Sequence, residues 1–340
     1  AARLGGDEFV ILCEDVGGEH EALAVAERIT AALAEPFDAH PGVARVCSSI
    51  GIAVTGAAGT RADAMLREAD AAMYRAKERG VACEVYDAEM RRRAEHRLGL
   101  EAELRRAAEE GEFVLHYQPV FRLTSGSITS CEALLRWANP SRGLLLPAEF
   151  LAVAEDAGLM LPIGAWAITS AARQARLWAL ERDGAPAPVV SVNLSPRQLL
   201  HHETVLNVQR ALEQSGAAPE TLCFEFTEGA VMADPARAGR VVRDLHDLGV
   251  RLAIDDFGTA QSSLRLLEQL PVDQVKIDRS FIAGMAESHE EAAIVAAVIG
   301  LAHAFGLEAV AEGVETLAQV DRLRALGVDA AQGHYFAAAQ

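Results

Sequence analysis

The sequence predicts an α/β protein in which a (β/α)8 barrel, similar in architecture to a TIM barrel, follows a smaller α/β domain. Between residues 113 and 340, short apolar stretches typical of buried strands alternate with stretches typical of amphipathic helices. About eight such strands in roughly 230 residues fit the size of a (β/α)8 barrel. An open, doubly wound sheet is the alternative, but the sequence has no Gly-x-Gly-x-x-Gly turn to support it.

The chain is acidic, with a formal net charge of −18 at pH 7. Such a surface repels phosphate backbones and anionic headgroups, so we expect no binding to a nucleic-acid polymer or a membrane surface. The five cysteines form no Cys-x-x-Cys pair, which favours a reducing compartment over disulfides or zinc. The longest uncharged stretch, residues 292–307, is too short to span a bilayer. We therefore expect a cytoplasmic chain, although a longer parent could be tethered through a preceding region.

The first 88 residues read as a small α/β domain. Gly5-Gly6-Asp7 predicts a tight turn between two short strands. Helices are predicted over 19–33 and over 62–79, and Gly80 provides a stop signal for the second. Two further strands are predicted at 46–54 and 81–86.

Residues 89–112 predict a single helix that leads into the barrel. The segment is rich in Arg, Glu, Leu and Ala, and it contains the run Arg91-Arg92-Arg93. Glutamates interleave with these arginines, so a solvated helix with i,i+4 ion pairs is favoured over a nucleic-acid patch.

The third region, residues 113–340, supplies the barrel. Its predicted strands are Val114–Tyr117, Ile128–Ala133, Val189–Asn193, Leu222–Phe226, Arg251–Asp255, Gln274–Ile277, Glu308–Ala311 and Ala330–Gln332. The helical stretches between them include Gly164–Ala179, Glu203–Ser215, Pro235–Leu248 and Glu290–Phe305.

Polar residues recur where these strands end, and in a barrel those ends converge on one mouth. The residues are Glu132, Asn193, Glu225, Asp255, Asp256, Lys276, Glu312 and Gln332. Five of them are carboxylates, whose mutual repulsion would require cations. An all-oxygen ligand set favours Mg²⁺ or Mn²⁺ over zinc, and two such ions could promote an in-line displacement at phosphorus. The pattern therefore predicts phosphodiester hydrolysis.

The N-terminal motifs resemble the second half of a GGDEF (diguanylate cyclase) domain. They are Arg3-Leu4-Gly5-Gly6-Asp7-Glu8-Phe9, then Ser49–Ala53 and Ala69–Lys77. In that family the preceding half holds a metal-binding aspartate and part of the GTP site, so Asp7 and Glu8 would stand without partners. The resemblance implies an inactive or regulatory remnant here, and GTP binding only in an intact parent.

The barrel motifs resemble those of EAL-domain cyclic di-GMP phosphodiesterases, and the resemblance covers nearly all of residues 96–340. The motifs, in order, are His116–Pro119, Cys131–Trp137, Ser191–Ser195, Glu225–Glu228, Asp255–Thr259, Val275–Asp278, Ala311–Thr316 and Gln332-Gly333. Each motif alone is weak evidence, whereas the ordered set is very specific.

The resemblance also implies roles for single residues. Two divalent cations, Mg²⁺ or Mn²⁺, would be held by Glu132, Asn193, Glu225, Asp255, Asp256 and Glu312. The expected catalytic residues are Lys276, which would hold the attacking water, with Asp256 and Glu312. Glu228 would anchor the loop after Asp256, and Gln118, Leu134, Arg136, Glu315 and Gln332 would lie near substrate. Cyclic di-GMP would be cut to linear pGpG by a homodimer formed through the EAL domains.

Two segments depart from the family pattern. Ala260 and Gln261 replace a glycine and an aromatic residue in the loop after Asp256, which puts turnover and dimer coupling in question. The end of the chain reads Ala337-Ala338-Ala339-Gln340 instead of a Pro-containing segment and a last helix, which raises the prospect of an open barrel edge. The alternative function is a receptor that binds cyclic di-GMP without cutting it. A diguanylate cyclase is a third interpretation, which the missing half disfavours.

Overall fold

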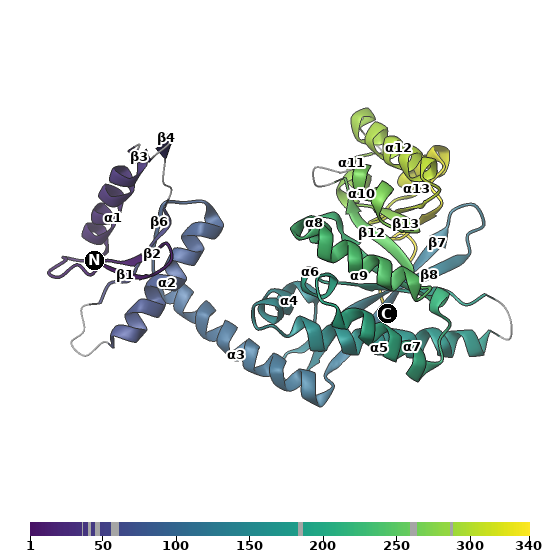
Figure 1. Cartoon of the computed structure of the whole chain (residues 1–340), viewed down its shortest axis with the longest axis horizontal. Coiled ribbons are helices and arrows are strands. Elements are labelled where there is room, and N and C mark those ends of the chain that lie inside the picture. Colours follow the sequence, from purple (N-terminus) through teal and green to yellow (C-terminus); the bar gives the residue numbers. More distant parts are fainter. Residues whose placement is uncertain are drawn as a thin grey trace. The chain divides into compact units, whose positions relative to one another are not determined.

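The computed structural model describes residues 1–35, 37–39, 42–44, 48–55, 61–182, 186–258, 264–285 and 288–340. The chain divides into two compact units, Ala1–Ala102 and Glu103–Gln340, and the two are described separately below (Figure 1). Residues 260 and 261, where the sequence departs from the family pattern, lie outside the described residues. So do residues 46 and 47, at the start of one predicted strand.

The N-terminal unit consists of short strands and two main helices before the long helix α3. Its elements are β1 (Ala2–Gly5), β2 (Glu8–Val10), α1 (Glu19–Ala34), β3 (Phe37–Ala39), β4 (Gly42–Ala44), β5 (Ile50–Ile52), α2 (Ala62–Arg79) and β6 (Cys83–Val85). β1 and β2 form the predicted hairpin, and β5 pairs with β6 in parallel. Gly51 lets β5 approach α2, because a Cβ there would lie 1.9 Å from the Ala69 carbonyl oxygen.

Helix α3 (Ala88–Glu110) occupies the segment in which a single helix was predicted. The division between the two units falls within this helix, after Ala102. Its last turns pack on the barrel unit, where Glu103 accepts a hydrogen bond from Asn139 Nδ2 (3.0 Å) and pairs with Arg142 Nη2 (3.2 Å).

The second unit is built around a closed barrel. Its strands are β7 (Phe113–Arg122), β8 (Ile128–Asn139), β10 (Val189–Asn193), β11 (Leu222–Thr227), β12 (Arg251–Phe257), β13 (Gln274–Ile277), β14 (Glu308–Ala311) and β15 (Ala330–Ala331). They are hydrogen-bonded in this order, with β15 pairing with β7 and β8 with β10. The predicted eight-stranded barrel is therefore confirmed. The open edge raised by the altered C-terminal sequence does not occur, because Ala331 pairs with Phe121.

Strand β7 departs from a regular (β/α)8 barrel. It runs antiparallel to both of its neighbours, β8 and β15, whereas the other barrel pairings are parallel. The reason is the connection at residues 123–127, which is far too short for the crossover that parallel strands need. This reversal places Gln118 opposite Glu132 in the register of β7 and β8. A further short strand, β9 (Gly143–Leu145), extends the sheet beyond β8.

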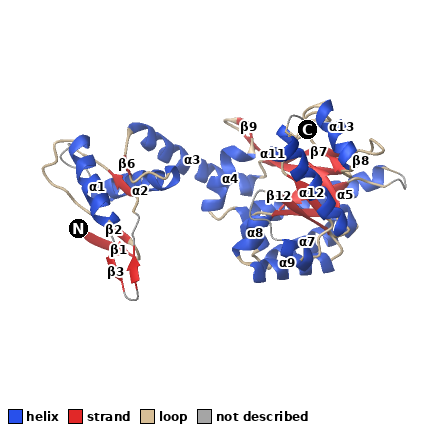
Figure 2. Ribbon diagram, turned by 90° about the horizontal axis from the view of Figure 1, so that it is seen from above, coloured by secondary structure: helices blue, strands red, loops and turns tan. Residues whose placement is uncertain are grey.

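Helices surround the barrel strands (Figure 2). They are α4 (Pro147–Asp156), α5 (Met160–Glu181), α6 (Pro196–Leu199), α7 (Glu203–Ser215), α8 (Glu228–Ala233), α9 (Pro235–Asp247), α10 (Leu264–Gln269), α11 (Arg279–Gly284), α12 (His289–Ala304) and α13 (Leu317–Leu326), with a 3-10 turn at Pro219–Thr221. Several begin at residues whose side chains cap the helix, among them Ser288 of α12 and Thr316 of α13.

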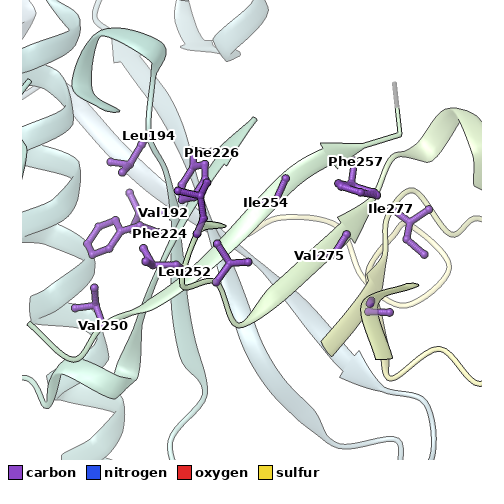
Figure 3. Close-up of a cluster of buried hydrophobic side chains, with 14 of the residues drawn as sticks. Val192, Leu194, Phe224, Phe226, Val250, Leu252, Ile254, Phe257, Val275 and Ile277 are labelled. Carbon is purple, nitrogen blue, oxygen red and sulfur yellow. The ribbon is translucent and has the colours of Figure 1, made fainter. Parts of the chain in front are cut away.

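The main core lies between the strands and the surrounding helices. Phe224 and Phe226 of β11 pack there with Leu252 and Ile254 of β12 (Figure 3). Since side chains alternate along a strand, Cys223 and Glu225 lie on the opposite, inward face. That interior holds a small apolar cluster of Val120, Val310 and Ala330. Among the described residues, no helix combines the length and apolarity needed to cross a bilayer.

Candidate active site

A buried lysine organises the polar residues at the carboxyl ends of the parallel strands. Lys276 of β13 is only 2% exposed. Its Nζ lies 2.5 Å from Glu225 Oε2, 3.3 Å from Glu132 Oε2 and 3.7 Å from Asp255 Oδ1. It also pairs with Glu312 Oε1. The structure thus brings together, around one ammonium group, residues predicted from four other strand ends.

The charge of this site is far from balanced, because four carboxylates face a single ammonium group. Burial, with neighbouring carboxylates, raises the pKa of Glu225 to about 8 and that of Glu312 to about 7. Burial alone would lower the pKa of Lys276, but the surrounding carboxylates hold it well above its usual range. The protein alone therefore cannot keep every one of these carboxyl groups ionised at neutral pH.

Glu132 is held more firmly than its neighbours. Asn193 Nδ2 donates a hydrogen bond to Glu132 Oε1 (2.7 Å), and Gln332 Nε2 donates one to Oε2 (2.7 Å). Burial would raise the pKa of Glu132, but Lys276 and these two amides hold it below its usual value. Glu132 is therefore ionised and fixed in orientation.

Two of the carboxylates around Lys276, those of Asp255 and Glu312, also form a group with Asp256. Oxygens of Asp255, Asp256 and Glu312 all lie within 4.8 Å of one another, and each residue is partly exposed. Asp256 adopts a left-handed conformation (φ 52°), which costs on the order of 1–3 kcal/mol for a residue other than glycine. Burial and the Asp255 charge raise the pKa of Asp256. An all-oxygen donor set under this electrostatic strain fits a hard divalent cation.

Asp278 is a member of the site that sequence reasoning did not assign to it. Its charge contributes to the raised pKa of Asp256, and its carboxylate also caps helix α11 through Ser280 N (3.0 Å). The signal was present, because Asp278 follows Lys276 by two residues and a strand places such residues on one face.

The remaining predicted residues occupy more varied positions. Gln118 accepts a hydrogen bond from Gln332 Nε2 (3.0 Å), so the structure brings this pair to Glu132. Arg136 lies further along β8 and donates to the Leu135 carbonyl (2.8 Å), and Leu134 precedes that residue. Glu228 is 2% exposed at the start of α8, whereas the loop it was expected to anchor includes residues outside the described part. The backbone of Glu315 donates to Gln319 Oε1 (2.8 Å).

The Gly5–Phe9 motif forms the β1–β2 hairpin in the other unit. Gly6 takes the left-handed conformation expected of a tight turn (φ 53°), and Arg3 Nη2 donates to the Gly6 carbonyl (2.5 Å). Asp7 and Glu8 are exposed. In the described part of the chain, the only group of three or more His, Cys, Asp or Glu side chains close enough to hold one cation is Asp255, Asp256 and Glu312.

The fold and the site define a closed eight-stranded barrel protein with a cluster of carboxylates at the carboxyl ends of its strands. Comparison with known families specifies the class. Residues 101–339 match the family described as "EAL domain", and residues 1–83 match "Diguanylate cyclase, GGDEF domain". The chain belongs to the EAL domain family, which confirms the resemblance inferred from the motifs.

Two curated relatives are similar over almost the whole chain. The bifunctional diguanylate cyclase/cyclic di-GMP phosphodiesterase MucR of Pseudomonas aeruginosa is 40% identical over 98% of this chain and 48% of its own length. The cyclic di-GMP phosphodiesterase PdeR of Escherichia coli is 35% identical over 99% of this chain and 50% of its own length. The chain thus spans about half the length of these relatives.

Two solved structures match about seven tenths of this chain. The "PaMucR Phosphodiesterase, c-di-GMP complex" has a TM-score of 0.68 and 41% sequence identity, and the match covers 71% of this chain and 97% of that one. The FimX EAL domain from Pseudomonas aeruginosa, bound to c-di-GMP, is 27% identical with a TM-score of 0.66, over 71% of this chain and 96% of that one.

Proposed function

We propose that the barrel unit hydrolyses cyclic di-GMP to linear pGpG. The observation that carries this proposal is the ring of buried carboxylates around Lys276, in a chain of the EAL domain family. Relatives that match nearly the whole chain are named cyclic di-GMP phosphodiesterases, and a solved relative holds c-di-GMP.

The site fits two divalent cations, Mg²⁺ or Mn²⁺. Its ligands would be the oxygen atoms of Glu132, Asn193, Glu225, Asp255, Asp256 and Glu312. The fit rests on the donor set and on charge, because burial and repulsion raise the pKa values of Glu225 and Glu312 into the neutral range. When bound, such ions would lower the pKa of a water molecule and stabilise the negative charge that develops on a phosphate.

The protein's own groups have distinct parts in this proposal. Lys276 Nζ offsets one negative charge, and its three N–H groups are directed at Glu132, Glu225 and Glu312. With cations bound to these carboxylates, one of the N–H groups would be released and would hold the attacking water. Asp256 and Glu312 complete the catalytic set, because their carboxylates lie close together at the partly exposed side of the site. Burial of Lys276 and Glu225 limits competing water around these charges.

The substrate would bind at the carboxyl ends of the barrel strands, next to the carboxylates around Lys276. Gln118, Leu134, Arg136, Glu315 and Gln332 are the proposed contacts, and Arg136 can offset phosphate charge. Glu228 would anchor the loop after Asp256 from the start of α8. We further propose homodimerisation through the barrel unit.

The N-terminal unit would be scaffold or a regulatory element. Its exposed Asp7 and Glu8 support this role, since neither belongs to a carboxylate cluster among the described residues. GTP binding is proposed only for a longer parent that contains a complete GGDEF domain.

Binding without cleavage is the second candidate function. Ala260 and Gln261 favour it, since this loop follows Asp256 and differs there from the family pattern. The barrel would then be a receptor for cyclic di-GMP.

A chromatographic assay separates the two candidates. Purified protein is incubated with cyclic di-GMP and Mg²⁺ or Mn²⁺, and a parallel sample contains EDTA. We expect pGpG only where the metal is available. Intact substrate together with measurable binding would support the receptor, and neither binding nor cleavage would contradict both.

A further inference from the structure

A chain of side-chain hydrogen bonds connects the metal-site residue Glu132 to the segment that follows the barrel. This post-barrel segment comprises residues 333–340. Gln118 Nε2 donates to the Ala337 carbonyl oxygen (3.0 Å). Gln332 Nε2 then donates both to Gln118 Oε1 (3.0 Å) and to Glu132 Oε2 (2.7 Å). Two amide side chains thus link a backbone carbonyl to a buried carboxylate.

The chemistry of these partners determines which atoms donate and which accept in this series of hydrogen bonds. Ala337 O and Glu132 Oε2 can only accept, so both ends demand amide nitrogens. Rotating the Gln332 amide would set its oxygen against Glu132 Oε2 and Gln118 Oε1, and both contacts would become repulsive. In the present orientation Gln332 Oε1 has no partner among the described residues, although it is buried. The two donated hydrogen bonds outweigh that unsatisfied acceptor, because one of them is charge-assisted.

The post-barrel segment is itself attached to the barrel. Gln340 and Tyr117 exchange two backbone hydrogen bonds (2.8 and 3.2 Å), and Phe336 stacks on Phe121 with ring centroids 5.0 Å apart. Gly333 starts the segment where a Cβ would lie 2.1 Å from the Val314 carbonyl oxygen. These contacts hold the Ala337 carbonyl at a defined place beside β7.

We propose that the post-barrel segment sets the orientation of the Glu132 carboxylate through Gln118 and Gln332. Gln118 is in this view a positioning residue, whose effect on the metal site passes through Gln332. Asn193 holds the other carboxylate oxygen, so Glu132 is positioned from two sides. The inference rests on the proposed metal site, and it adds that a segment outside the strand ends controls that site.

The test measures Mn²⁺ affinity without substrate, by titration calorimetry of the full chain. The variants are Gln118→Leu, a chain shortened to end at Phe336, and the two changes combined. Partners that orient a metal ligand typically affect affinity by about 10- to 100-fold, and we expect a loss in this range for each single variant. We expect the combined variant to bind Mn²⁺ with the same affinity as the single variant that binds it less tightly. The reason is that both changes interrupt the same series of hydrogen bonds.

The matched control is Gln274→Leu. Gln274 starts β13 and donates to Glu308 Oε2 (2.7 Å). This variant therefore also removes a glutamine amide from the barrel, but it leaves the hydrogen bonds of Gln118 and Gln332 intact. We expect its Mn²⁺ affinity to match that of the unchanged protein. Additive losses in the combined variant, or unchanged affinity in Gln118→Leu, would overturn the proposal. Should the shortened chain not fold, Phe336→Ala replaces it in the same scheme.

A metal-free measurement keeps this test separate from the proposed function. In unliganded protein, the NMR signal of the Gln332 side-chain amide reports its hydrogen bond to Glu132. We expect that signal to move in Gln118→Leu and in the shortened chain, and to stay in place in Gln274→Leu. If the unchanged protein binds no Mn²⁺, the proposed metal site fails, and the NMR signal alone still decides whether the segment positions Glu132.

Discussion

The N-terminal unit and the barrel treat the same kinds of residue differently. Phe9 is 66% exposed and Leu12 is 69% exposed, whereas Phe224 is fully buried and Phe226 is 1% exposed. The cause is the size of the sheet, because β1 and β2 form a sheet of two strands among the described residues, while β11 has neighbours on both sides and helices over one face. Burial therefore follows from enclosure and not from hydrophobicity alone.

Acidic residues show the same contrast. Asp7 and Glu8 are exposed in the hairpin, and Glu225 is 2% exposed beside Lys276. An exposed carboxylate is hydrated and needs no partner, whereas a buried one must be paired or bind a cation. The barrel thus turns a common residue into a candidate metal ligand, and the hairpin does not.

The largest expected effect is on catalysis and belongs to the barrel. Glu132→Ala removes a proposed metal ligand together with the acceptor of the Asn193 and Gln332 hydrogen bonds. We expect pGpG formation to fall by more than about 100-fold, the upper end of what loss of a ligand's supporting partner causes. The matched change in the other unit is Glu27→Ala on the exposed side of α1, and turnover there should be unchanged. Substantial activity in Glu132→Ala would show that the ligand assignment is wrong.

The next contrast concerns the two phenylalanines. Phe224→Ala should lower the free energy of unfolding by about 3–5 kcal/mol, because it leaves a cavity in the core. Phe9→Ala should change it by no more than about 0.5 kcal/mol, as for most exposed positions. Urea unfolding followed by circular dichroism measures both. Equal losses would mean that the hairpin is enclosed in solution.

Two glycines sharpen the comparison at the level of the backbone. Gly333→Ala would place a Cβ 2.1 Å from the Val314 carbonyl oxygen. Relieving this clash requires a shift of the backbone, which costs free energy of folding. We expect a loss of about 1–3 kcal/mol, as for other overpacked sites. Gly5→Ala meets no atom within 4 Å and should leave stability almost unchanged. Melting temperatures of the two variants give the answer, and similar values would contradict it.

The last expected effect concerns the metal-free barrel, whose stability should depend on pH. Because burial raises the pKa of Glu225 to about 8 and that of Glu312 to about 7, the folded state binds more protons than the unfolded state between about pH 4.5 and pH 8. Stability should therefore fall as pH rises through this window. The three tryptophans, Trp137, Trp166 and Trp178, all lie in the barrel unit, so their fluorescence reports its melting alone.

Added Mn²⁺ should reverse this trend. Its stabilisation should be larger at pH 8 than at pH 6, because protons compete with the cation for the same carboxylates. A melting temperature that rises with pH in EDTA would show that the pKa values of Glu225 and Glu312 are not raised in the folded protein.

Much of the barrel could be predicted from sequence because its parallel strands are buried on both faces. The strands Val189–Asn193, Gln274–Ile277 and Glu308–Ala311 have the predicted bounds, since short apolar runs end there at a polar residue or a turn. The convergence of Glu132, Glu225 and Lys276 followed from the barrel alone.

Other features left no comparable signal. The reversed direction of β7 depends on a short connection, and the apolar pattern of a strand is the same in either direction. The contact between Gln118 and the Ala337 carbonyl involves backbone, which carries no side-chain signature. Glu315 and Arg136 were placed near substrate by resemblance, and those roles stay predictions.

The central claim is that one buried site at the strand ends takes two divalent cations. The most direct measurement is the anomalous scattering of crystals grown with Mn²⁺. The account predicts two peaks within reach of the oxygens of Glu132, Asn193, Glu225, Asp255, Asp256 and Glu312. A map without Mn²⁺ at these residues, or with the ions elsewhere on the chain, would contradict it.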